Sequence, residues 1–137
     1  MTLQKSPRYL NPKLLQLARG MHCAHCGIED GTTVAAHSPF AIHGHGRGIK
    51  SHDCFVAFLD YRCHAWLDQD YGLMDGFSSK REDKLEFFRN AHTNTILHLL
   101  KIGKIKLADE VCEGEFFLVG NEREILDYWR EGKIHIT

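Results

Sequence analysis

The sequence predicts a small α+β domain built around a structural metal ion. The chain has 137 residues, which is the size of one domain. Short β-prone segments alternate along it with segments of helical periodicity. Histidine is unusually frequent, and seven of the ten histidines lie between His22 and His64 together with four of the five cysteines. This concentration of nitrogen and sulfur ligands favours a metal-binding protein.

Composition narrows the class of protein further. Apolar residues make up 43% of the chain and charged residues 26%, as in an ordinary folded protein. No apolar run is long enough to span a membrane, and the N-terminal residues do not form a signal peptide. We therefore expect a cytoplasmic protein with no membrane partner, whose cysteines stay reduced and bind metal rather than form disulfides.

The small net charge of −1 hides an asymmetry. Residues 1–108 carry 14 lysines and arginines against 10 acidic residues, whereas residues 109–137 carry 3 against 8. A modestly basic body suits a polyanion partner such as DNA. The acidic segment 109–137 is expected to be an extension of unassigned function, and a protein partner is one hypothesis for it.

The first elements follow from local signals. Residues 1–11 are expected to form an irregular arm. Asn11 can cap a short helix that has Pro12 at its first position and stops near Gly20. The β-prone residues from Thr32 to His37 then predict a strand.

A second strand and a helix follow a loop. Residues 38–53 are rich in glycine and histidine and are expected to form this loop. The apolar run Cys54–Leu59 predicts the strand. Residues 62–69 predict a helix, for which Asp60 is a plausible N-terminal cap.

The rest of the chain predicts one long helix and a small sheet. Apolar residues recur at helical spacing over about Lys80–Ile102, with Ser79 as a cap and Gly103 at the end. Glu115–Val119 predicts a strand and Glu122–Trp129 a short helix. The segments 100–108 and 129–137 resemble each other, since each has a helix end, Gly-Lys and a β-prone tetrapeptide. The two tetrapeptides are expected to pair.

Cys23-x-x-Cys26 is the first motif with chemical content. A redox pair normally follows a strand in a thioredoxin-like unit, which is not visible here, so zinc is favoured. Zinc needs four ligands, and Cys63 is the natural third. A second CxxC would require cysteine at position 60, where the chain has Asp60. We assign Asp60 as the fourth ligand, while the alternatives Cys54, His22 and His25 stay open.

A second set of residues favours catalysis. His64 and Asp68 lie four residues apart, so a helix places them on one face, where they can bind a divalent cation. Cys63 directly precedes His64, so one helix start would carry ligands of two metal sites. His37 ends the first strand, and a histidine beside a bound metal can act as a general base on water.

The order of these motifs resembles that of the HNH (His-Me finger, ββα-metal) endonucleases. It is closest to phage and prophage proteins of the YbcO type, a family of proposed nucleases. The resemblance covers about residues 12–108, which we take as one nuclease-like domain. It rests on Ala18-Arg19-Gly20, Val34-Ala35-Ala36-His37-Ser38, Gly46-Arg47-Gly48-Ile49-Lys50-Ser51-His52-Asp53, and Cys63-His64 with Asp68.

The resemblance implies a fold and a set of roles. The fold would be a small ββα-metal core with a structural zinc site and flanking helices. His37 would be the general base and Asp53 the residue that orients it. His64 and Asp68 would bind one catalytic magnesium or manganese ion, and Arg47 and Lys50 would hold the DNA backbone.

Three positions depart from the family pattern. Ala36 stands where a further metal ligand often precedes the base, a role that His43 or His45 could fill. No asparagine lies between His37 and His64, and Asp60 replaces a cysteine.

The leading hypothesis is a phage-type DNA endonuclease, which would act on both strands as a homodimer or in two events. The alternative is a non-catalytic, zinc-stabilised DNA-binding module of the same fold.

Overall fold

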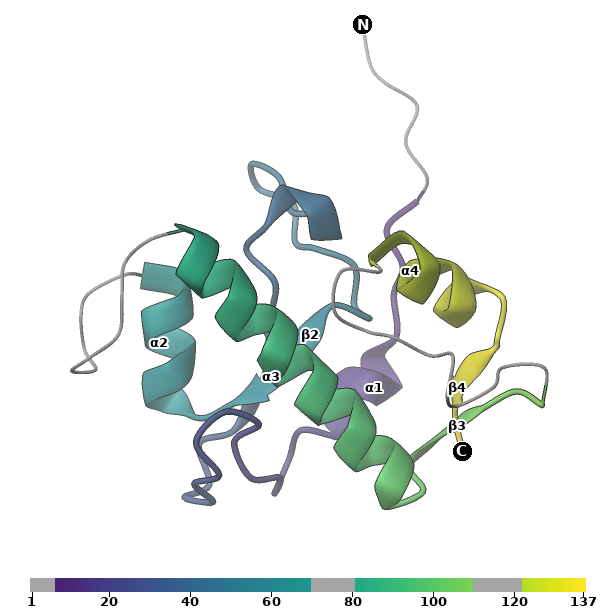
Figure 1. Cartoon of the computed structure of the whole chain (residues 1–137), viewed down its shortest axis with the longest axis horizontal. Coiled ribbons are helices and arrows are strands. Elements are labelled where there is room, and N and C mark those ends of the chain that lie inside the picture. The colour runs from purple at the N-terminus through teal and green to yellow at the C-terminus, as the bar shows by residue number, and fades with distance from the viewer. Residues whose placement is uncertain (1–6, 70–80, 110–121) are drawn as a thin grey trace, which may run out of the picture.

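The structure is a computed structural model that describes residues 7–69, 81–109 and 122–137 (Figure 1). It confirms the predicted α+β class, with helices and two small antiparallel sheets. The predicted strand Glu115–Val119 and the predicted cap Ser79 lie outside the described residues. Within the described ranges, no helix combines the length and apolar character that crossing a bilayer requires.

The elements follow the predicted order closely. In chain order they are α1 (Pro12–Gln16), β1 (Val34–His37), the 3-10 helix η1 (Ala41–His43), β2 (Val56–Leu59), α2 (Tyr61–Gln69), α3 (Arg81–Lys101), β3 (Ile105–Leu107), α4 (Glu122–Arg130) and β4 (Ile134–Ile136). Helix α1 begins as predicted, because the Asn11 side chain accepts a hydrogen bond from the Leu14 N–H at 3.1 Å. The turns after it end at Gly20, whose φ of +75° favours glycine.

Strands β1 and β2 form an antiparallel pair that leads directly into α2. His37 lies opposite Val56 at one end of the pair, and Val34 lies opposite Leu59 at the other. Asp60 alone separates β2 from α2, and its Oδ1 accepts hydrogen bonds from the N–H groups of Arg62 and Cys63. The predicted N-terminal cap of α2 is therefore present.

Strand β2 is buried on both faces and separates two hydrophobic clusters. Alternate side chains of a strand point to opposite faces. Val56 and Phe58 accordingly join one cluster, with Leu14, Ile96, Leu99, Ile105, Ile125, Trp129 and Ile134. Ala57 and Leu59 join the other, with Cys23, Ala36, Cys63, Trp66, Leu67, Phe87 and Phe88. Both sides of this short strand are thus fixed by packing.

Helix α3 connects the two clusters, because its first half supplies Phe87 and Phe88 to one and its second half supplies Ile96 and Leu99 to the other. It runs diagonally across β2, with α2 on one side and α4, β3 and β4 on the other (Figure 1). The long helix therefore holds the β1–β2–α2 unit against the rest of the chain.

Residues 122–137 pack with the body of the protein. Strand β4 pairs antiparallel with β3, as the repeat in the sequence predicted, with Ile105 opposite Ile136. Ile125, Trp129 and Ile134 are buried in the same cluster as Leu14. Strand β3 precedes residue 108 in the chain and its partner β4 follows it. A boundary at this residue therefore does not divide the chain into two separately packed units.

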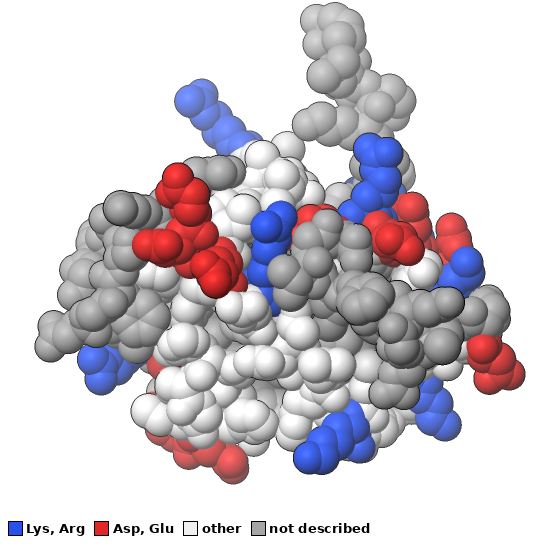
Figure 2. Space-filling view, viewed as in Figure 1, with Lys and Arg blue, Asp and Glu red and all other residues white. Residues whose placement is uncertain are grey.

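Charged residues of both signs are interspersed on the face that carries α3 (Figure 2). Acidic side chains gather near the start of α3, where Glu82 and Asp83 lie in the first turn. Acidic residues there suit the positive end of the helix dipole. The described residues form no continuous basic surface on this face (Figure 2).

Candidate metal centre and candidate active site

The Cys23–Cys26 segment forms a tight turn against the end of β2. The Cys23 N–H donates to the Ile28 carbonyl at 2.8 Å, and the Gly27 N–H donates to the Cys23 carbonyl at 2.9 Å. Gly27 has a φ of +80°, which favours glycine at this turn. The Ala24 N–H donates to the Phe58 carbonyl at 2.7 Å, so β2 fixes the turn in place.

The predicted zinc ligands come together at this turn. One ligand atom from each of Cys23, Cys26, Asp60 and Cys63 lies within 4.8 Å of the others. The Cys26 thiol donates a hydrogen bond to Asp60 Oδ2 at 2.7 Å. Two ligands therefore come from the turn and two from the junction of β2 and α2, and the cluster could hold a metal ion such as zinc.

The alternative fourth ligands lie elsewhere. Cys54 is fully buried in the hydrophobic cluster on the opposite side of β2. The His22 ring packs edge-on against His98 at 4.6 Å, and the His25 ring packs against Phe87 at 4.5 Å. The geometry therefore favours Asp60 over Cys54, His22 and His25 as the fourth ligand.

The protonation of the cluster follows from its hydrogen bonds and its burial. The hydrogen bond from Cys63 lowers the pKa of Cys23 to about 6, and the same bond raises the pKa of Cys63. Burial and the contact with Asp60 raise the pKa of Cys26 to about 11. Burial opposes ionisation of Asp60, but hydrogen bonds led by that of Cys26 hold its pKa at about 2. Protons thus remain on Cys26 and Cys63, and a divalent cation would replace them.

A separate pocket holds the residues expected to be catalytic. It has a volume of about 460 Å³ and lies between β1, the glycine-rich loop and α2. Its lining residues are Ala35, His37, Ser38, Pro39, His45, Lys50, His64 and Asp68. The structure thus places His37, Lys50, His64 and Asp68, four residues chosen from the sequence, around one space.

His37 is held by Asp53 from behind the pocket. Its Nε2 lies 2.8 Å from Asp53 Oδ1, and both side chains are largely buried. An ionised carboxylate can only accept hydrogen bonds, so the ring nitrogen donates here and Nε2 carries the proton. Nδ1 is then the nitrogen with a free lone pair, which is the form that a general base requires.

His64 and Asp68 form a pair on one face of α2. The His64 Nε2 lies 2.8 Å from Asp68 Oδ2, and each side chain is more than one-third exposed. In the described ranges, the cysteine cluster is the one group of three or more potential metal ligands found close together. A cation bound by His64 and Asp68 would therefore take its other ligands from water or phosphate.

The remaining loop residues divide between the pocket and its surroundings. Lys50 and His45 line the pocket. Arg47 occupies the exposed tip of a turn closed by reciprocal hydrogen bonds between the backbones of Gly46 and Ile49, and it does not line the pocket. His43 is buried, with its ring nitrogens near Ser38 and Glu122, so His45 is the loop histidine available to a ligand.

Ala36 does not face the pocket. Its neighbours Ala35 and His37 line that space, whereas Ala36 is 1% exposed and packs in the cluster with Ala57. Alternation along the strand explains this difference. In this structure, a longer side chain at position 36 would point into the core.

Arg8 is a residue that the sequence analysis missed. Its guanidinium lies 2.8 Å from Asp53, which is 45 positions away in the chain. Nothing in the local sequence distinguishes Arg8 from other arginines, since it lies in an irregular segment without a motif.

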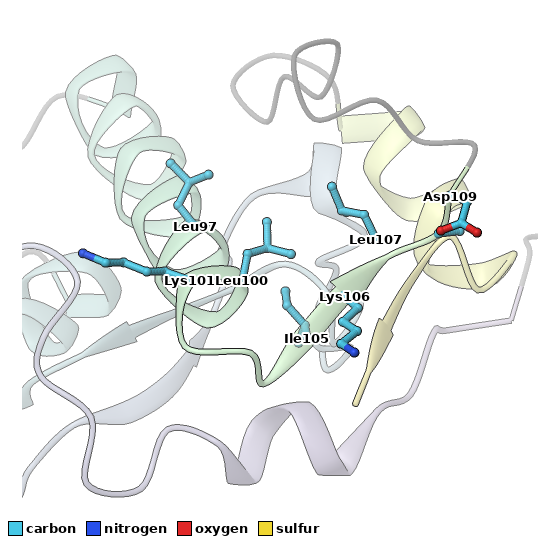
Figure 3. Close-up of a pocket in the computed structure, with 8 residues that line it drawn as sticks. Leu97, Leu100, Lys101, Ile105, Lys106, Leu107 and Asp109 are labelled. Atoms are coloured by element: carbon cyan, nitrogen blue, oxygen red, sulfur yellow. The ribbon is translucent and has the colours of Figure 1, made fainter.

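A larger pocket of about 660 Å³ lies beside the end of α3 and β3 (Figure 3). Its lining combines the apolar side chains of Leu97, Leu100, Ile105 and Leu107 with the charged residues Lys101, Lys106 and Asp109. None of its described lining residues is a histidine or a cysteine, and it adjoins the point where the described residues end at Asp109. The candidate active site is therefore assigned to the smaller pocket.

Comparison of the chain with protein-family models, with curated proteins and with solved structures gave no match in any of the three.

Proposed function

We propose that this protein is a metal-dependent endonuclease of the HNH type that hydrolyses DNA phosphodiester bonds. The observation that supports this function best is the shared pocket. A histidine with a fixed tautomer, a His-Asp pair and a lysine surround one space, although they come from β1, the loop and α2. These are the groups that phosphodiester hydrolysis needs: a base, a cation site and a donor for the phosphate.

The proposed mechanism assigns a step to each residue. Asp53 holds the His37 ring so that Nδ1 can take a proton from an attacking water. Lys50 donates to the phosphate, and Arg47 contacts the DNA backbone outside the pocket. His64 and Asp68 would hold magnesium or manganese, which supplies stabilisation of the charge on the phosphate and the leaving oxygen. Cleavage of both strands would require two copies of the chain or two successive events.

The cysteine cluster has a structural role in this proposal. Zinc at Cys23, Cys26, Asp60 and Cys63 would join the turn before β1 to the first turn of α2. His64 follows Cys63 directly, so fixing Cys63 also fixes the start of the catalytic face of α2. Zinc would thus support the site without taking part in the chemistry.

Plasmid nicking tests the enzymatic function. Wild-type protein is incubated with supercoiled DNA and magnesium or manganese, with EDTA as a control, and compared with His37→Ala. Loss of a general base should reduce the rate by roughly 10²–10⁴-fold. His135→Ala is a matched control, because His135 is an exposed histidine on β4 that does not line the pocket. Equal nicking by His37→Ala and wild type would contradict the assignment of the base.

A zinc-stabilised DNA-binding module is the second candidate. It is favoured by the small number of ligands at His64 and Asp68. Such a module would bind DNA in a salt-sensitive way, because its contacts would be to phosphates. Its binding would also be unchanged in His37→Ala, and no metal ion would support nicking. Nicking by the wild type that is lost in His37→Ala would exclude this candidate.

A further inference from the structure

The segment before α1 packs along the end of the glycine-rich loop. The Asp53 N–H donates to the Tyr9 carbonyl at 2.9 Å, and the Tyr9 N–H donates to His52 Nδ1 at 3.0 Å. The Asn11 N–H donates to Asp53 Oδ2 at 2.7 Å. Asp53 is therefore held by this segment through its backbone and through one carboxylate oxygen.

Arg8 binds the other carboxylate oxygen. Its Nη2 donates to Asp53 Oδ1 at 2.8 Å, and its Nε donates to the Ser51 carbonyl at 3.0 Å. The same Oδ1 accepts the hydrogen bond from His37 Nε2. Arg8 Nη2 lies 3.4 Å from that nitrogen, but both carry protons, so the two groups meet at the carboxylate and do not bond to each other.

This arrangement has an electrostatic consequence. A carboxylate beside a histidine favours the imidazolium form, which cannot accept a proton. A guanidinium on the same oxygen offsets that effect and still leaves the carboxylate able to orient the ring. We propose that Arg8 is a positioning residue of the candidate active site, which acts through Asp53 to keep the His37 ring oriented and ready to accept a proton. The inference rests on the proposed role of His37 as a base.

The surroundings of His37 support an indirect role for Arg8. Arg8 does not line the pocket, so it is not placed to touch a phosphate bound there. Its side chain is one-third exposed, whereas that of Asp53 is 4% exposed. The other charged or titratable groups around the ring are His45 and Lys50 of the loop, His64 and Asp68 of α2, and His52 and Tyr9 beside Asp53. Among the groups placed around the ring, Arg8 is the cation that contacts Asp53 directly.

Nuclear magnetic resonance tests the inference without requiring catalysis. The ¹⁵N shifts of the His37 ring are followed with pH in the purified protein without added magnesium. Arg8→Gln removes the charge, Arg8→Lys keeps it, and Arg123→Gln removes an equal charge from an exposed position on α4. We expect His37 in Arg8→Gln to take up its second proton at a pH about one unit higher than in wild type. Arg8→Lys should restore most of the difference, and Arg123→Gln should match wild type.

The Asp53→Asn background provides the second test. If Arg8 acts through the carboxylate, adding Arg8→Gln to Asp53→Asn should produce little further change in the titration. An Arg8→Gln titration equal to that of wild type, in a variant whose amide spectrum is still folded, would overturn the proposal. An effect of Arg8→Gln on the titration that is equally large in the wild type and in the Asp53→Asn variant would also overturn the proposal. Failure of the wild type to nick DNA would remove the proposed function but leave this titration result standing.

Discussion

The two carboxylate oxygens of Asp60 have different partners. Oδ1 accepts hydrogen bonds from the Arg62 N–H at 2.8 Å and the Cys63 N–H at 3.1 Å, and so caps α2. Oδ2 lies in the cysteine cluster, where Cys26 donates to it. A cysteine at this position would bind zinc but would cap the helix poorly, whereas a serine would cap it but bind zinc poorly.

Two substitutions should separate these roles. Asp60→Ser is expected to weaken zinc binding while it keeps most of the stability of the metal-free protein. Asp60→Cys is expected to retain zinc binding and to lose about 1 kcal/mol of the metal-free free energy of unfolding, since the cap is lost. Chelator competition measures the affinity, and urea unfolding measures the stability. Wild-type zinc affinity in Asp60→Ser would show that Asp60 is not a ligand.

Zinc affinity should also depend on pH. The pKa of Cys26 is raised to about 11 and that of Cys63 is raised as well, so both thiols are protonated at neutral pH and must release protons when the metal binds. Affinity is therefore expected to increase from pH 6 to pH 8, by up to about tenfold per pH unit for each proton released. Competition with a chelator of known pH dependence measures this. A flat profile would mean that the cysteines are not the ligands.

Helix α2 connects the two candidate sites. Its cap and Cys63 belong to the cysteine cluster, and the next residue on the helix, His64, lines the pocket with Asp68. The helix is nine residues long, which is too short to be stable alone. It therefore depends on the contacts of its buried residues Trp66 and Leu67 and on the anchoring of its first turn.

Removal of the metal should loosen α2 first. We expect faster amide hydrogen exchange in residues 61–69 after treatment with a strong chelator, because the first turn loses its anchor. Helix α4, which packs in the other cluster, serves as an internal reference and should keep its protection. Mass spectrometry of the exchanged protein reports both regions. Equal changes in α2 and α4 would indicate that the metal stabilises the whole molecule and not this helix in particular.

Local signals in the sequence predicted most of the elements. Asn11 with Pro12, Asp60 and Gly103 mark helix ends through their own side-chain or backbone chemistry, so their effect does not depend on the fold. The cysteine cluster was also predictable, because the Cys23-x-x-Cys26 spacing indicates a metal site and Cys63 lies at a predicted helix start together with Asp60. The role of Arg8 and the burial of Ile125, Trp129 and Ile134 were not predictable from local signals, since both depend on contacts between distant parts of the chain. The 3-10 helix at Ala41–His43 within the loop also had no clear signal.

Two buried histidines, His43 and His92, affect the stability of the whole molecule through their protonation. His92 on α3 lies within hydrogen-bond distance of the Cys54 carbonyl at 2.9 Å, and His43 lies beside Phe55 and Phe88. Burial lowers the pKa of each to about 4, and the nearby His92 ring further lowers the pKa of His43. Both histidines are therefore neutral in the folded protein at neutral pH.

Acid should destabilise the fold through these rings. In the unfolded chain a histidine binds a proton near pH 6.5, whereas in the folded protein His43 and His92 do so only near pH 4. The unfolded state thus binds more protons between these values, so stability is expected to fall as the pH drops from about 6.5 to 4. His92→Gln, which retains a donor for the Cys54 carbonyl, should reduce this pH dependence. Thermal unfolding over this range tests it, and an unchanged slope in the variant would contradict the assignment.

The contact between the N-terminal segment and α4 affects how the protein matures during synthesis. Arg130 donates a hydrogen bond to the Pro7 carbonyl, and the Tyr9 ring packs 6.3 Å from Trp129. Residues 7–11 are synthesised before these partners, which lie more than a hundred residues later in the chain. This segment, which includes Arg8 and contacts Asp53, can therefore complete its contacts with α4 only after residue 130 has emerged. If the proposed nuclease activity is correct, a nascent chain would lack the full support of Asp53 until residue 130 has been made.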